Sequence, residues 1–184
     1  MTFNAQSSKI KFEKWNKESQ IEFETPWFTI LEKDSYFTLQ YTNSQVVILP
    51  IIENLQILLV KVKRPVIGTS TWELPAGGLE KGETEKDSAL RELKEETGVL
   101  IDDKNRLKPM NTLVISPTRM PMFPSLFSIN ITKEEFELRQ SHDDEVEEVG
   151  LFSFDEIRQM ILNEEVFVSL PLAILSRFLL SRIR

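Results

Sequence analysis

The run VVILPII, from Val46 to Ile52, constrains the fold more than any other segment of this chain. It is almost continuously apolar and does not alternate with polar residues. That pattern is typical of a β-strand covered on both faces. The run therefore predicts a central sheet with other elements packed above and below it.

Other strand and helix patterns surround this run. Further strands are expected in the segments IEFETPWFTILEK, YFTLQYT, LQILLVKV, NTLVISP, SLFSINIT and VGLFSF. A helix is expected between Thr84, which starts a capping box with Asp87, and Gly98. Two more are expected at residues 155–162 and 170–183. The order of elements predicts an α/β fold with a mixed sheet between helices.

Composition excludes several classes of function. The 184 residues, 41% of them hydrophobic, suit one compact unit, and a net charge of -7 with scattered basic residues argues against nucleic-acid binding. There is no cysteine, so disulfides, thiolate metal sites and cysteine nucleophiles are excluded. The N-terminus lacks a signal-peptide core, and FVSLPLAILSRFLL is interrupted by Pro171 and Arg177. We expect a cytoplasmic protein that does not contact membranes.

Three carboxylates crowd one face of the first expected helix, at Glu92, Glu95 and Glu96 in RELKEETG. Like charges at this spacing cost a helix about 0.2–0.5 kcal/mol per pair. A divalent cation would reverse that repulsion, and Mg²⁺ prefers oxygen ligands. The glycine-rich turn at residues 76–78 offers a close-lying carbonyl, and Arg91 can hold the carboxylates by bidentate hydrogen bonds. The alternative is a solvated charged face.

The spacing around these carboxylates resembles the Nudix box. The segment GGLEKGETEKDSALRELKEETGV fits that pattern without departure at Gly77, Glu83, Arg91, Glu92, Leu93, Glu95, Glu96, Gly98 and Val99. With each of seven fixed letters near a 7% frequency, chance gives such a match about once in 10⁸ windows. We therefore set the solvated face aside.

The resemblance implies a Nudix hydrolase, an α/β/α sandwich that splits a nucleoside diphosphate linked to another group. By carry-over, Glu92, Glu95 and Glu96 bind the catalytic Mg²⁺ or Mn²⁺, and Arg91 orients them. Glu83 supports the junction of loop and helix. Residues 45–184 would form this domain, after an N-terminal β-rich arm at residues 1–44.

The sequence before the box narrows the substrate. WELPAG, ending at Gly77, is similar to the branch that hydrolyses ADP-ribose and nucleoside diphosphate sugars. This implies that the Ala76 carbonyl is a metal ligand and that Glu73 lies in the substrate pocket. Ser116-Pro117 also resembles that branch. The expected products are a nucleoside monophosphate and a sugar phosphate.

Two segments depart from the branch. Val62-Lys63-Arg64-Pro65 stands where a more basic sequence is usual, so Arg64 is either the phosphate contact or an ordinary surface arginine. Thr118-Arg119-Met120 stands where many members have glycine, which places strict ADP-ribose specificity in question.

The resemblance also suggests a base, a stacking site and a partner. A late acidic loop would supply the catalytic base, with Glu145 as first candidate and Asp143 and Asp144 as alternatives. Trp27 and Phe28 are candidates for stacking on the nucleobase. The alternative for both residues is a place in the hydrophobic core. The branch implies a homodimer paired through its N-terminal strands.

Two other functions stay open at this point. A house-cleaning nucleoside triphosphatase shares the box but usually lacks the WELPAG flank. A Nudix-like sensor binds its ligand without cleaving it and tends to lose box carboxylates, all of which this chain retains.

Overall fold

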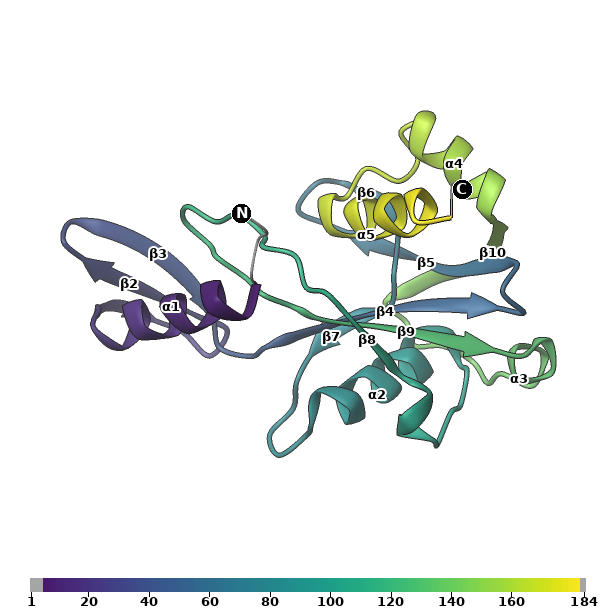
Figure 1. Ribbon diagram of the computed structural model, residues 1–184, viewed down its shortest axis with the longest axis horizontal. Helices are drawn as coiled ribbons and strands as arrows, with labels where there is room; N and C mark the ends of the chain where they lie inside the picture. Colours follow the sequence, from purple (N-terminus) through teal and green to yellow (C-terminus); the bar gives the residue numbers. More distant parts are fainter. Residues whose placement is uncertain (1–4, 183–184) are drawn as a thin grey trace.

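The structure, a computed structural model, describes residues 5–182 (Figure 1). Its helices are α1 (Ala5–Lys17), α2 (Glu85–Thr97), α3 (Lys133–Glu137), α4 (Phe154–Leu162) and α5 (Ser169–Leu180). Its strands are β1 (Gln20–Glu24), β2 (Phe28–Lys33), β3 (Tyr36–Tyr41), β4 (Gln45–Ile52), β5 (Gln56–Arg64), β6 (Thr69–Glu73), β7 (Ala76–Gly78), β8 (Lys108–Met110), β9 (Ser125–Ile131) and β10 (Val146–Ser153). No described helix combines the length and apolar character needed to cross a bilayer.

Strand β4 lies at the centre of the main sheet, as the run VVILPII predicts. The sheet has seven strands, with β10-β5-β4-β9-β8 in order, β6 beside β5 and β7 beside β4. The β4–β9 pair is parallel and the other pairs are antiparallel. Residues 46–52 are all buried, and their side chains alternate between two apolar clusters. The strand is therefore covered on both faces, which confirms the prediction.

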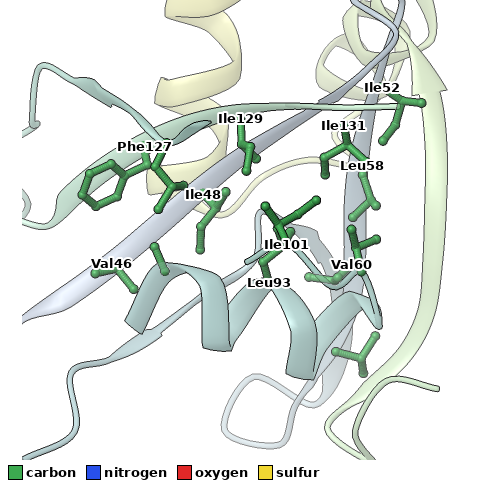
Figure 2. Close-up of a cluster of buried hydrophobic side chains, with 14 of the residues drawn as sticks. Val46, Ile48, Ile52, Leu58, Val60, Leu93, Ile101, Phe127, Ile129 and Ile131 are labelled. Carbon is green, nitrogen blue, oxygen red and sulfur yellow. The ribbon is translucent and has the colours of Figure 1, made fainter. Parts of the chain in front are cut away.

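Helices cover the two faces of this sheet (Figure 1). Leu93 of α2 packs against Val46, Ile48 and Val60 of the sheet in one cluster, and Figure 2 shows these side chains converging above the helix. On the opposite face, Ile157 of α4 and the apolar residues of α5 pack against β4 and β5. The mixed α/β fold with a sheet between helices is confirmed.

Helix α2 begins and ends where the sequence predicts. The Thr84 hydroxyl accepts a hydrogen bond from the Asp87 backbone N–H, and the Asp87 side chain accepts from the Thr84 N–H, which completes the capping box. Gly98 follows the last turn with a φ of 74°, a left-handed conformation that residues with a Cβ adopt at a cost. These two caps set where the helix begins and ends, and therefore on which turns the carboxylates lie.

A second, smaller sheet lies beside the main body. Strands β1, β2 and β3 form an antiparallel sheet, and Trp15 of α1 contacts Tyr36 of β3 edge-on with ring centroids 6.3 Å apart. The loop at residues 116–122 docks on β3: the Tyr36 hydroxyl donates to the Thr118 carbonyl, and the Arg119 guanidinium stacks over the Tyr36 ring. Thr118 and Arg119, which stand where glycine is common in the ADP-ribose branch, thus attach this loop to the small sheet.

Two predictions of secondary structure need correction. The expected strand NTLVISP is wrong: β8 ends at Met110, and in residues 111–124 the only ladder contact described is an isolated bridge between Ile115 and Met122. Three prolines in or near this segment cannot donate to a ladder, and Ser116 has a φ of 44°. The last helix ends at Leu180, before the predicted limit at 183, a position outside the described residues.

Candidate active site

The guanidinium of Arg91 joins the glycine-rich loop to helix α2. Its Nε and Nη2 donate to the two carboxylate oxygens of Glu83, at 2.8 and 3.0 Å. Its Nη1 donates to Glu92 at 2.8 Å and to Glu95 at 2.9 Å, and Nη2 also donates to the Gly78 carbonyl at 2.8 Å. These hydrogen bonds raise the pKa of Arg91 and lower that of Glu83. One cation thus holds three of the box carboxylates in place.

Glu96 is the most strongly perturbed of the clustered carboxylates. It accepts a hydrogen bond from the Ala76 backbone N–H at 3.0 Å. Burial raises the pKa of Glu96 to about 8, and the charges of Glu92 and Asp143 add to the effect, while the Ala76 bond opposes it. Burial also raises the pKa of Glu92, which is 8% exposed. Without a cation, this part of the site holds negative charge poorly.

The backbone at Gly77 lies directly against the Glu92 side chain. Strand β7 pairs Gly77 with Val46 and Ala76 with Val47, which fixes this turn on the central strand. A Cβ at Gly77 would lie 2.0 Å from Oε1 of Glu92, whereas one at Gly78 would meet only ordinary contacts near 3.6 Å. The absence of a side chain at Gly77 is therefore needed for the carboxylate to occupy its position.

The donor set suits a hard divalent cation. Glu92, Glu95, Glu96 and the adjacent backbone at Ala76 supply only oxygen ligands, which Mg²⁺ and Mn²⁺ favour. Within residues 5–182, no three Asp, Glu or His side chains are already gathered as a metal cage. The hydrogen bonds explain this, since Glu92 and Glu95 contact Arg91 while Glu96 contacts Ala76. The residues fit a hard divalent cation, which would favour the charged form of Glu96.

The late acidic loop is attached to the end of α2 by backbone hydrogen bonds. The Gln140 N–H donates to the Gly98 carbonyl and the Asp143 N–H to the Glu95 carbonyl, both at 2.8 Å. A Cβ on Gly98 would lie 1.9 Å from the Gln140 carbonyl oxygen. The charge of Asp143 raises the pKa of Glu96, while that of Glu145 contributes to raising the pKa of Arg64. Two of the three base candidates, Asp143 and Glu145, therefore act electrostatically on the site.

An open cavity of about 730 Å³ adjoins the box. Ala76 and Gly77 line it, together with Arg64, Glu73 and the tip of the β5–β6 hairpin at Val66 and Ile67. Val66 is 99% exposed. The structure thus brings two predicted substrate-binding residues, Arg64 and Glu73, to the cavity that Ala76 and Gly77 border.

Trp27 and Phe28 are not among the residues that line this cavity. Trp27 precedes β2 and is 73% exposed, so the core role considered for it is wrong. Phe28 is half-buried, and its ring centroid lies 6.3 Å from that of Phe23. The aromatic residue that lines the cavity is Tyr41, at the end of β3. Sequence pattern gives no signal for Tyr41, because its place depends on how the two sheets dock.

We expect the charge of Glu96 to make folding pH-dependent in metal-free protein. Its pKa is higher in the folded state (about 8) than its ordinary value of 4.5, so its stabilising contribution is full below pH 4.5 and is lost as pH rises through 8. Relative to Glu96→Gln, the wild type should lose up to about 1.4 kcal/mol per pH unit within that window. Urea unfolding in EDTA at pH 5, 6.5 and 8 measures the free energy of unfolding of both proteins. A difference between them that does not change with pH would contradict the prediction.

Gly77→Ala should weaken metal binding, because the new Cβ would displace the Glu92 carboxylate. Loss of a fixed ligand position predicts a fall in Mn²⁺ affinity of about tenfold or more. Titration of Mn²⁺ followed by electron paramagnetic resonance measures it. Gly78→Ala is the matched control and should bind Mn²⁺ as the wild type does; equal affinity in both variants would exclude this role for Gly77.

Comparison with known proteins gives the family. A family model described as the NUDIX domain matches residues 42–170. Over 98 residues, the chain is 33% identical to a protein named Phosphatase NudJ from Escherichia coli K12 and equally to one of that name from Shigella flexneri. Each alignment covers 53% of this chain and 61% of the relative, so the chain matches about three fifths of their length. With the model matching more than half of its residues, this chain belongs to the NUDIX domain family.

Proposed function

We propose that this chain hydrolyses the pyrophosphate bond of a nucleoside diphosphate linked to a second group. The observation that carries the proposal is the Arg91-centred cluster, in which box carboxylates lie beside the backbone of Ala76 and Gly77. Nudix hydrolases generally use divalent metals such as Mg²⁺. The raised pKa of Glu96 supports a cation at this position, since a bound cation would favour the charged form of this buried carboxylate.

Each residue of the cluster has a distinct role in this proposal. Glu92, Glu95 and Glu96, with the Ala76 carbonyl, would hold Mg²⁺ or Mn²⁺, which would neutralise the pyrophosphate and favour ionisation of the attacking water. Arg91 orients Glu92 and Glu95, and it ties them to Glu83 in the loop. The protein supplies positioning and charge stabilisation around the reacting phosphorus.

Glu145 is our proposed general base, with Asp143 and Asp144 as alternatives. The carboxylate would accept the proton of the water that attacks phosphorus. Glu145 is exposed, and its backbone N–H donates to the Asp143 side chain at 3.1 Å, which orders the loop. The attachment of this loop to α2 supports a base that is fixed relative to the metal ligands.

The substrate that we propose is ADP-ribose or a related nucleoside diphosphate sugar, cleaved to a nucleoside monophosphate and a sugar phosphate. The WELPAG flank supports this choice, because it forms the edge of the cavity through Glu73, Leu74, Ala76 and Gly77. The cavity volume, about 730 Å³, lies in the range of small-molecule sites.

A homodimer in the cytoplasm completes the proposal. The small sheet exposes several large apolar side chains, Ile21, Phe23, Trp27 and Phe37. The strand registers place Phe23 and Phe37 on one face of this sheet, and a second copy of the chain is the proposed cover for that face. Sedimentation velocity at micromolar concentration tests it: a monomer would contradict the dimer.

A substrate panel tests the activity. Purified protein with Mg²⁺ is incubated with ADP-ribose, nucleoside diphosphate sugars, dinucleoside polyphosphates, NADH and dNTPs, and released monophosphate is measured. We expect turnover of ADP-ribose or a nucleoside diphosphate sugar. Preference for dNTPs would decide for the house-cleaning alternative, and ligand-dependent thermal stabilisation without hydrolysis would decide for a sensor.

Glu96→Gln should lower kcat by a factor on the order of 10² or more, because the substituted side chain cannot offer a charged ligand. Glu85→Gln is the matched control, since Glu85 is exposed on the first turn of the same helix. Glu145→Gln and Asp143→Asn, measured alongside, rank the base candidates. Full activity in Glu96→Gln would remove Glu96 from the metal site.

A further inference from the structure

We propose that Glu73 is a positioning residue, which holds the Arg64 guanidinium in the cavity so that the free edge of Arg64 binds the diphosphate of the substrate. This inference rests on the proposed function, because it assigns a phosphate-binding group to the same site. It also separates two residues expected to contact substrate: Arg64 would contact the ligand, and Glu73 would act through Arg64.

The ion pair between the two residues has bidentate geometry. Arg64 Nε donates to Oε1 of Glu73 at 2.7 Å, and Nη2 donates to Oε2 at 3.0 Å. The backbone register places Arg64 opposite Thr69 and Glu73 opposite Val60, so the two side chains reach along the ladder rather than directly across it. Two parallel hydrogen bonds fix the plane of the guanidinium as well as its position.

Glu73 has little capacity left for a ligand. It is 8% exposed, and the Thr71 hydroxyl donates to Oε1 at 2.5 Å, in addition to the two bonds from Arg64. Thr71 and Glu73 lie on the same face of β6, two residues apart, and Thr71 is itself buried. A carboxylate so engaged would repel a phosphate unless the arginine lay between them. Thr71 is not among the site residues expected from the sequence. Its position two residues before Glu73 on a strand places both side chains on one face, which could have indicated the contact.

Arg64 keeps part of its guanidinium available. Its side chain is 47% exposed, and among the described residues no hydrogen-bond acceptor is assigned to Nη1. The pKa of Arg64 is raised, first by the hydrogen bonds to Glu73 and then by the charges of Glu73, Glu96 and Glu145. Arg64 therefore lies within electrostatic range of Glu96 and Glu145. The exposed part of this guanidinium is therefore available to a diphosphate in the cavity.

A purely structural ion pair is the competing explanation. The pair would then only stiffen the β5–β6 hairpin, and its loss would lower thermal stability without changing ligand affinity. A second bidentate pair supplies a control for this case, since the Arg106 guanidinium donates to both carboxylate oxygens of Glu135 in α3. Neither Arg106 nor Glu135 is among the cavity-lining residues. Glu135→Gln therefore removes an ion pair of the same geometry without touching the proposed site.

A double-mutant cycle tests the inference. Wild type, Arg64→Ala, Glu73→Gln, the double variant and Glu135→Gln are compared by calorimetric titration with inorganic pyrophosphate and Mg²⁺, by KM and kcat, and by Tm. Glu73→Gln keeps the shape of the side chain and an acceptor for Thr71. It should raise the pyrophosphate Kd and the KM about tenfold, with a smaller change in kcat, because the arginine is misplaced.

The double variant gives the decisive comparison. If Glu73 acts only through Arg64, the double variant should match Arg64→Ala, since a positioning residue has nothing left to position. A further loss of affinity in the double variant would show direct contact of Glu73 with the ligand and overturn the inference. Unchanged pyrophosphate affinity in Glu73→Gln, with a lower Tm alone, would also overturn it.

The binding measurement separates this inference from the proposed function. Protein that binds pyrophosphate but hydrolyses no diphosphate on the panel would refute the function, while the cycle of Kd values would still decide the role of Glu73. Wild-type protein that does not bind pyrophosphate would overturn the inference, whatever the panel shows.

Discussion

The charge of one guanidinium, that of Arg91, holds the carboxylate-rich site together. It binds Glu83 in the loop, Glu92 and Glu95 on the helix, and the carbonyl of Gly78. Without it, the carboxylates would repel one another and the loop would lose its attachment to α2. The same guanidinium occupies oxygens of Glu92 and Glu95 that a cation would also need. Arg91 and a divalent metal would therefore share the same carboxylate oxygens.

Much of the fold could be predicted because its signals are local. The apolar run at residues 46–52 marks a doubly covered strand, and the Thr84 cap and Gly98 bracket the helix that carries the box. Each signal depends on a few neighbouring residues, and each matches the structure. The placement of Arg91 between Glu83 and Glu92 follows from the same helix register.

The remaining features depend on contacts between distant segments. The strand expected in NTLVISP is instead a loop, and part of that loop binds β3 through Thr118 and Arg119. The apolar pattern does not reveal that Trp27 is exposed, or that Arg64 pairs with Glu73. The division at residue 44, the base among Asp143, Asp144 and Glu145, the metal and the cytoplasmic location stay predictions.

The attachment of the acidic loop to α2 has an evolutionary consequence. Because Gln140 and Asp143 bond to the backbone at Gly98 and Glu95, insertions or deletions in the loop would shift groups on both sides of the site together. The β5–β6 tip, by contrast, projects Val66 into solvent at the mouth of the cavity. Sequence variation at the tip can change which molecules enter while the carboxylates keep their arrangement. Descendants of this chain would thus vary the mouth of the cavity through the hairpin and inherit the arrangement of the carboxylates unchanged.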